Sequence, residues 1–178
     1  MISEKEKQIC LNVARESIAE KLKIVEKMSI CPSEAIFKRS FGLFVTLNIK
    51  ARLRGCIGYI IPYKPLYESL VELSRAAAFN DNRFKPVVKE EFDDLHIEIS
   101  ILSPLFEVKD KKEIVVGRDG LYMQHPRGSG LLLPQVATKY GWNRAEFLKE
   151  TCHKAGLQED FLDDKVLKIF RFEAEIFS

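Results

Sequence analysis

Residues 41–61 read FGLFVTLNIKARLRGCIGYII, and apolar side chains alternate with others on both sides of Lys50–Arg52. Alternation with a period of two is typical of β-strands that bury one face. Because a short polar link joins the two alternating runs, the stretch predicts an antiparallel hairpin. The rest of the chain is expected to cover and extend the sheet that this hairpin begins.

Helical spacing of apolar residues flanks the hairpin on both sides. Ser3–Glu6 has the pattern of a capping box, and apolar residues recur at helical spacing from Ile9 to Leu22. This predicts a helix from about residue 4 to the mid-20s. Pro65 suits the first turn of a second helix. We expect its buried stripe to be formed by Leu66, Leu70, Leu73 and Ala77.

The second half of the chain mixes short strands and helices. Strands are expected near residues 95–101, 121–124, 131–133 and 170–176. Helices are expected at 134–140 and after Asn143, and the glycine-rich segment Arg127–Gly130 is expected to form a hairpin turn. Because strands and helices do not alternate strictly, the pattern favours an α+β fold with a mostly antiparallel sheet flanked by helices. No Pro/Gly/Ser-rich linker is visible, so residues 1–178 are expected to form a single domain.

Composition excludes several classes of protein. The 178 residues are 46% hydrophobic and 30% charged, an ordinary globular balance. Lys and Arg number 28 and Asp and Glu 26, and a net charge of +2 argues against nucleic-acid binding through phosphate neutralisation. No apolar run approaches the ~18–20 residues that span a bilayer, and the first residues lack the apolar core of a signal peptide. We therefore expect a cytoplasmic protein with no nucleic-acid or membrane partner.

The cysteines and histidines give no metal-binding pattern. The four cysteines, Cys10, Cys31, Cys56 and Cys152, lie far apart and form no CxxC pair, and the three histidines are scattered. In a reducing compartment these cysteines should be free thiols. We expect no metal site and no cofactor.

One strand carries the strongest chemical signal. Strict alternation would place Arg54, Cys56 and Gly58 on one face, with about 6.5–7 Å between next neighbours on that face. A guanidinium beside a thiol lowers the pKa of the thiol, so Cys56 and Arg54 are candidate catalytic residues of a thiolate or anion site. Gly55 and Gly58 mark close approach by a ligand or by another backbone segment. The alternative is that Cys56 packs in the core and Arg54 pairs with a surface carboxylate.

Three polar residues outside this strand are further candidates for ligand binding. Asp81 and Arg83 follow the second predicted helix, where they could bind a substrate or clamp Arg54. They could equally form a structural cap and ion pair. Gln135 follows Pro134 at a helix start, where its amide and the free backbone N–H groups could hold an anion or simply cap the helix.

Several segments together resemble one known family. LRGCIG at 53–58 resembles the signature hexapeptide of the AMMECR domain family, also called AmmeMemoRadiSam system protein A. Further segments resemble its landmarks in the same order: AAAFNDNRF at 76–84, LHIEISIL at 95–102, GRDGL at 117–121, GLLLPQVA at 130–137 and CHKAGL at 152–157. The resemblance covers about residues 40–177. It implies two unequal, interwoven α+β subdomains, the larger with an antiparallel sheet flanked by helices.

The resemblance implies a context rather than a reaction. The activity of the family is unassigned, and its name records association with a Memo-like protein and a radical-SAM protein. It therefore implies a component of a shared pathway or complex with such partners, in which we expect a ligand cleft near Arg54 and Cys56. The alternative is a thiol-dependent enzyme in which Cys56 attacks an anionic small molecule. The CxxxCxxC cluster of radical-SAM enzymes is absent from this chain.

Overall fold

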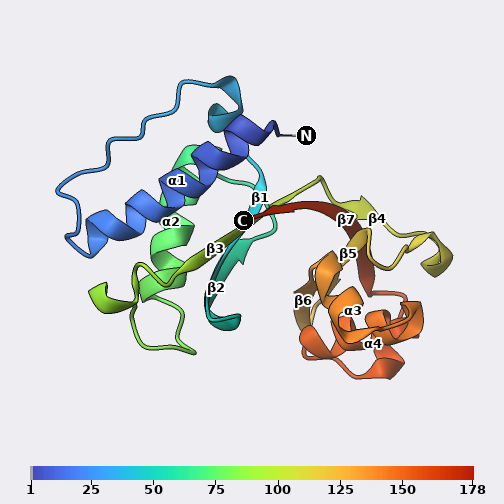
Figure 1. Ribbon diagram of the computed structural model, residues 1–178. Coiled ribbons are helices and arrows are strands. Elements are labelled where there is room, and N and C mark those ends of the chain that lie inside the picture. Colours follow the sequence, from blue (N-terminus) through green and yellow to red (C-terminus); the bar gives the residue numbers. More distant parts are fainter. Residues whose placement is uncertain (1) are drawn as a thin grey trace. The chain divides into compact units, whose positions relative to one another are not determined.

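The computed structural model describes residues 2–178, and the chain divides into two compact units. The first unit runs to Leu102 and includes Glu175–Ser178, and the second is Ser103–Ala174. Helices and antiparallel strands occur in both units, so the predicted α+β class is confirmed (Figure 1). Within the described residues, no helix is long and apolar enough to cross a membrane.

The sheet of the first unit is built on the predicted hairpin. Strand β1 (Gly42–Ile49) pairs antiparallel with β2 (Arg52–Tyr59) on one side and with β3 (His96–Leu102) on the other. The order β2-β1-β3 leaves β2 at the edge of the sheet. One face of these strands contributes buried residues to the core of the unit, among them Leu43, Val45, Leu47, Ile97, Ile99 and Ile101.

Two helices complete the core of the first unit. Helix α1 (Glu4–Lys21) starts with the predicted capping box and ends a few residues earlier than expected, before Lys23, whose φ of 57° is left-handed. Helix α2 (Leu66–Phe79) follows Pro65, and its four predicted core residues are all buried. Figure 1 shows α1 and α2 lying alongside each other. Two short 3₁₀ helices, η1 (Ala35–Lys38) and η2 (Lys89–Glu91), lie in connecting loops.

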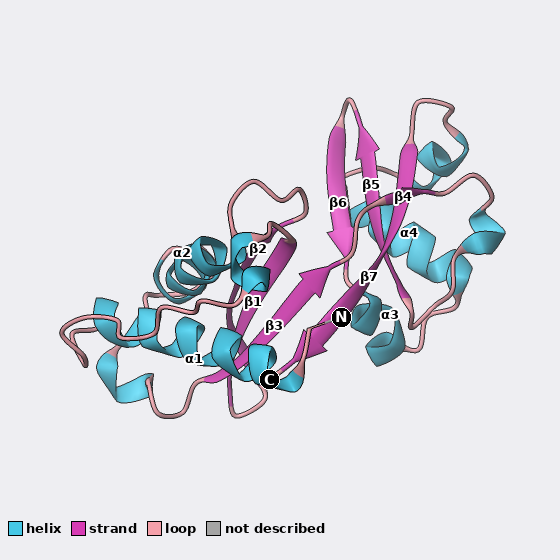
Figure 2. Cartoon of the chain, turned by 90° about the horizontal axis from the view of Figure 1, so that it is seen from above, coloured by secondary structure: helices cyan, strands magenta, loops and turns pink. Residues whose placement is uncertain are grey.

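The second unit contains further antiparallel strands and has a core of its own. Most of strand β7 (Lys168–Phe177) belongs to this unit, where it pairs with β4 (Phe106–Glu107) and with β5 (Asp119–His125). Strand β6 (Gly128–Leu132) pairs with β5. Figure 2 shows β5 and β6 as a long hairpin. Helices α3 (Pro134–Tyr140) and α4 (Arg144–Lys154), the latter with the predicted Asn143–Glu146 capping box, contribute to the core, and η3 (Lys111–Glu113) and η4 (Glu159–Asp163) lie in loops.

The hairpin expected here is confirmed, but its turn is shorter than the predicted Arg127–Gly130. The turn is only Pro126–Arg127, and Gly128 and Gly130 both belong to β6. A Cβ atom on Gly128 would lie 2.2 Å from the carbonyl oxygen of Ala155, and one on Gly130 would lie 2.3 Å from the nitrogen of that residue. The glycines are therefore needed where the strand crosses the end of α4, a long-range contact that the local pattern does not reveal.

Candidate functional site

A β-bulge interrupts the alternation of β2 at Arg54. Leu47 of β1 lies opposite Gly55 and the next residue, Asn48, lies opposite Leu53, so Arg54 has no partner residue on β1. A bulge inserts one extra residue and re-aims side chains locally. The simple alternation that would place Arg54 beside Cys56 on one face therefore does not extend through this position.

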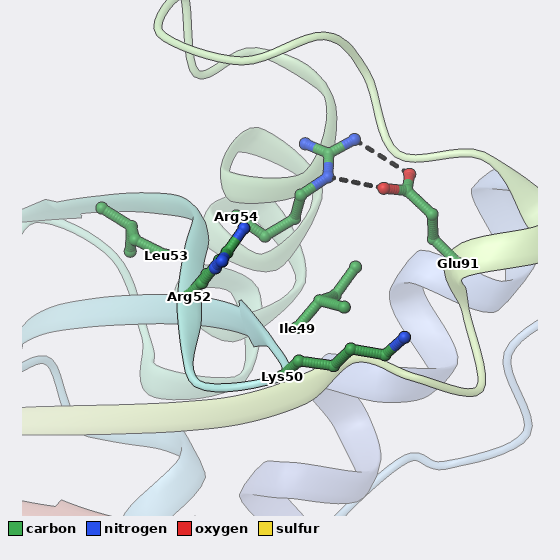
Figure 3. Close-up of a pocket in the computed structure, with 6 residues that line it drawn as sticks. All are labelled: Ile49, Lys50, Arg52, Leu53, Arg54 and Glu91. Carbon is green, nitrogen blue, oxygen red and sulfur yellow. Dashed lines mark hydrogen bonds and ion pairs between the residues drawn. The ribbon is translucent and has the colours of Figure 1, made fainter.

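The Arg54 guanidinium is held by the loop that follows α2. Its Nε donates to Glu91 Oε1 at 2.8 Å and its Nη2 to Glu91 Oε2 at 2.9 Å, a two-point ion pair drawn in Figure 3. Nη1 and Nη2 also donate to the carbonyl oxygens of Lys85 and Pro86, at 2.8 and 3.2 Å. The hydrogen bonds from Arg54 lower the pKa of Glu91. Arg54 therefore fastens β2 to the loop 85–91.

A pocket of about 490 Å³ opens beside this ion pair, at the turn between β1 and β2. Its lining combines apolar, cationic and acidic side chains: Ile49, Lys50, Arg52, Leu53, Arg54 and Glu91 (Figure 3). The carboxylate of Glu91 neutralises the charge of Arg54. Among the ion pairs found in residues 2–178, none includes Lys50 or Arg52. The pocket is therefore electropositive, and the side chain of Leu53 is open to it.

The turn that forms the rim of the pocket is strained. Ile49 and Arg52 lie opposite each other, and the two residues between them, Lys50 and Ala51, have φ values of 49° and 61°. Positive φ at both central residues is the type I′ geometry, which Asn-Gly usually supplies. For other residues the left-handed conformation costs roughly 1–2 kcal/mol each. Such strain concentrates at ligand sites and switch regions.

Cys56 does not line this pocket, and its environment keeps the thiol protonated. The side chain is half-buried, and Thr46 Oγ1 lies 3.3 Å from its Sγ. Burial raises the pKa of Cys56, although the hydrogen bond from Thr46 and the charge of Arg83 act in the opposite direction. The cation that acts on this thiol is therefore Arg83. The other cysteines are free, with Cys10 and Cys152 buried and Cys31 exposed.

Asp81 and Arg83 bracket the backbone of Cys56 at the open edge of the sheet. Asp81 Oδ2 accepts the Cys56 N–H at 2.9 Å, and Arg83 Nη2 donates to the Cys56 carbonyl oxygen at 3.1 Å. The two side chains are joined at 2.9 Å (Nε to Oδ1) and 2.7 Å (Nη2 to Oδ2). Asp81 is only 5% exposed, and the Arg83 guanidinium holds its pKa well below the usual range. This Asp81–Arg83 bracket occupies backbone groups that an added strand would otherwise use.

The two candidate glycines of the strand are explained by packing. A Cβ atom on Gly55 would lie 2.0 Å from the carbonyl oxygen of Ala77 in α2. One on Gly58 would lie 2.3 Å from Cδ1 of Phe44 and 2.4 Å from the carbonyl oxygen of Leu43. Both glycines therefore mark close approach by other parts of the first unit.

The structure brings some predicted site residues together and separates others. Cys56, Asp81 and Arg83 form one cluster, whereas Arg54 lines the pocket. Gln135 lies in α3 of the second unit, and its buried Oε1 has no hydrogen-bond partner among the described residues.

Local sequence patterns did not identify the other residues that line the pocket: Ile49, Lys50, Arg52, Leu53 and Glu91. Two positive charges within the short predicted link Lys50–Arg52 were the sequence feature that could have indicated Lys50 and Arg52. Glu91 is 37 residues from Arg54 and had no local signal. Across the described part of the chain, no group of three or more His, Cys, Asp or Glu residues is placed to hold a metal ion.

The chain is similar to known proteins over most of its length. The AMMECR1 family model matches residues 11–177. A protein of Methanothermobacter thermautotrophicus is 42% identical over 184 residues, which cover 99% of this chain and 95% of that protein. A protein of Aquifex aeolicus is 44% identical over 148 residues, covering 79% of this chain and 76% of that protein. The crystal structure of an uncharacterized protein from Pyrococcus horikoshii superposes with a TM-score of 0.90 at 39% identity, covering 98% of this chain and 92% of that one.

Proposed function

The chain belongs to the AMMECR1 family, and on that premise we propose that it is a ligand-binding component of a shared pathway or complex rather than an enzyme in its own right. The Pyrococcus relative is itself described as uncharacterized, so the likeness carries no reaction. The partners in this proposal are those that the family resemblance implied, a Memo-like protein and a radical-SAM protein.

The observation that carries the proposal is the pocket at the β1–β2 turn. Ligand sites are typically concave, partly apolar and lined by a few convergent polar groups. This pocket combines two apolar side chains with two cations that lack an ion-pair partner among the described residues. The Arg54–Glu91 pair forms part of its lining, and the strained turn at Lys50 and Ala51 lies at its rim. The lining also includes Leu53 and Arg54, the first two residues of the LRGCIG segment.

The alternative, a thiol-dependent enzyme, has weaker support. A nucleophilic cysteine needs a lowered pKa and access to its substrate. Burial raises the pKa of Cys56, and Cys56 is absent from the lining of the pocket. The Asp81–Arg83 bracket, moreover, uses its charges to hold backbone groups of Cys56. Ligand binding at the turn is therefore the better-supported role.

Thermal shift with a panel of anionic, cationic and neutral small molecules tests the proposal. A ligand that binds only the folded chain raises its melting temperature in proportion to RT ln(1 + [L]/Kd). Leu53→Ser alters the exposed apolar side chain of the pocket. Val166→Ser is the matched control, because Val166 is similarly exposed, at 54% against 43% for Leu53, and lies in the second unit. Ligands should stabilise the wild type and Val166→Ser but not Leu53→Ser. Equal shifts in all three proteins, or no shift with any compound, would overturn the proposal.

The partner part of the proposal has a separate test. Sedimentation velocity of the purified chain mixed with a purified Memo-like protein and a purified radical-SAM protein should reveal a faster-sedimenting species. If the three proteins sediment independently at micromolar concentrations, they form no stable complex. The proposed complex would then be rejected, and a shared pathway would be the part that stands.

A further inference from the structure

We propose that the pocket at the β1–β2 turn binds a phosphate monoester that carries an apolar body of about the size of a nucleoside. This inference rests on the proposed function, because it names the ligand class of the same site. Three properties of the pocket carry it: the arrangement of its charges, its apolar surface with its volume, and its fixed backbone.

The charges of the pocket favour one dianionic group. The Arg54 guanidinium is already matched at two points by the Glu91 carboxylate and by two backbone carbonyls. Lys50 and Arg52 are the cations left over in the lining. A phosphate monoester carries about −1.5 to −2 charges near pH 7 and several strong acceptor oxygens, which suits two cations better than a single carboxylate does.

The acid in the lining limits which phosphates fit. Glu91 places a fixed negative charge beside Arg54, and like charges within the same pocket repel. A second phosphate directed toward Arg54 would meet this carboxylate. The pocket therefore favours a single phosphate near Lys50 and Arg52 over a diphosphate or triphosphate.

A phosphate alone would neither cover the apolar side chains of the pocket nor fill its volume. Ile49 and Leu53 line the pocket, and 43% of Leu53 is exposed to solvent. In Figure 3 the Ile49 side chain is seen between Lys50 and the Arg54–Glu91 pair. A volume of about 490 Å³ lies within the range of typical small-molecule sites, whereas inorganic phosphate would fill only a small part of it. An apolar body attached to the phosphate would cover these side chains.

The backbone that carries the pocket is fixed, whereas the side chains of Lys50 and Arg52 are exposed. The two-residue turn fixes Lys50 beside the start of β2, and Arg54 is held at four points by the loop 85–91. Because the backbone is already ordered, the entropy cost of binding is limited to the side chains that order on the ligand. This accounts for the strain at Lys50, because the turn places a cation in the lining of the pocket. Asn or Gly at this position would relieve the backbone strain but would remove the charge.

Isothermal titration calorimetry on the full chain tests this inference with four probes: phenyl phosphate, inorganic phosphate, benzoate and phenol. Phenyl phosphate should bind more tightly than each of the other three, and its affinity should fall as NaCl is raised, because salt screens the charges. Arg52→Ala and Lys50→Asn should each weaken phenyl phosphate by about tenfold, the usual value of a charged hydrogen bond. Asn tolerates positive φ, so Lys50→Asn removes the charge without adding backbone strain.

Lys139→Ala is the matched control, because Lys139 is an exposed lysine of the second unit. It should leave the affinity for phenyl phosphate unchanged. If Arg52→Ala and Lys50→Asn bind phenyl phosphate as the wild type does, the inference is overturned. If benzoate or phenol binds as well as phenyl phosphate and Leu53→Ser abolishes that binding, the phosphate class is rejected while the proposed function stands. If none of these probes and none of the compound panel responds to Leu53→Ser, the inference and the proposed function fail together.

Discussion

The two halves of strand β2 have different surroundings. Arg52 and Leu53 are exposed and line the pocket. Arg54 lies at the bulge, and its side chain pairs with Glu91. From Gly55 onward the strand is packed against α2 and β1, and its edge is closed by the Asp81–Arg83 bracket. The difference shows that one strand can be packed at one end and open to solvent at the other, with the bulge between the two parts.

The sharpest test of the packed half is Gly55→Ala. The added Cβ atom would lie 2.0 Å from the carbonyl oxygen of Ala77, so β2 and α2 would have to separate. Overpacking of this kind should lower the free energy of unfolding by about 3 kcal/mol, measured by urea denaturation. Gly141→Ala is the control, since its φ is +67° but nothing lies within 4 Å of the new atom, and it should cost only about 1 kcal/mol. Equal losses in the two variants would contradict the packing role of Gly55.

Asp81→Asn should have the next largest effect. The substitution removes the charge of a buried carboxylate that accepts a hydrogen bond from the Cys56 N–H and pairs with Arg83. The Arg83 side chain is half exposed. We expect a loss of about 2 kcal/mol in the free energy of unfolding. Asp93→Asn, at an exposed position two residues beyond Glu91, should change stability by less than about 0.5 kcal/mol. A loss in Asp81→Asn no greater than in Asp93→Asn would mean that the bracket contributes nothing.

The same pair predicts a pH dependence. The pKa of Asp81 is lower in the folded chain than its unfolded value of about 3.9, so its stabilising contribution is fully present above that pH. The contribution is lost as the pH falls toward the lowered folded value. The difference in unfolding free energy between the wild type and Asp81→Asn should therefore be widest near neutral pH and shrink below pH ~4. A difference that grows on acidification would have the wrong sign for this carboxylate.

The thiol of Cys56 should react slowly, which distinguishes the two proposed roles. Because thiolates are the reactive form and burial raises the pKa of Cys56, iodoacetamide at mildly alkaline pH should modify exposed Cys31 first. Mass spectrometry of the alkylated peptides gives both rates in one sample. Arg83→Ala should slow Cys56 further, whereas Arg54→Ala should leave it unchanged. Faster reaction at Cys56 than at Cys31, or a response to Arg54→Ala, would favour the thiol-dependent enzyme.

The smallest predicted effect lies in the turn that precedes the open half of β2. Ala51→Gly relieves a left-handed residue with φ of 61° and should raise the free energy of unfolding by about 0.5 kcal/mol, after the entropy cost of glycine is subtracted. Ala51 does not line the pocket, so the affinity for phenyl phosphate should stay at the wild-type value. A loss of stability in thermal or urea unfolding would contradict the assignment of strain to this turn.

Local patterns in the sequence were sufficient for most of the fold. The capping boxes at Ser3 and Asn143, the stripe on α2 and the β1–β2 hairpin all follow from residues a few positions apart, whose side chains meet whenever the element forms. The family landmarks likewise lie in continuous segments. The hairpin at Arg127–Gly130 was predicted with too long a turn, because Gly128 and Gly130 are required by the distant backbone of Ala155.

The sequence by itself therefore determined the family, the α+β class and the hairpin whose second strand carries Arg54 and Cys56. Only the tertiary structure decided which neighbours those side chains have. It separates Arg54, paired with Glu91 at the pocket, from Cys56, held by Asp81 and Arg83. The physical reason is that one bulge shifts the register of a strand, and that ion pairs between residues 37 positions apart depend on how loops return to the sheet.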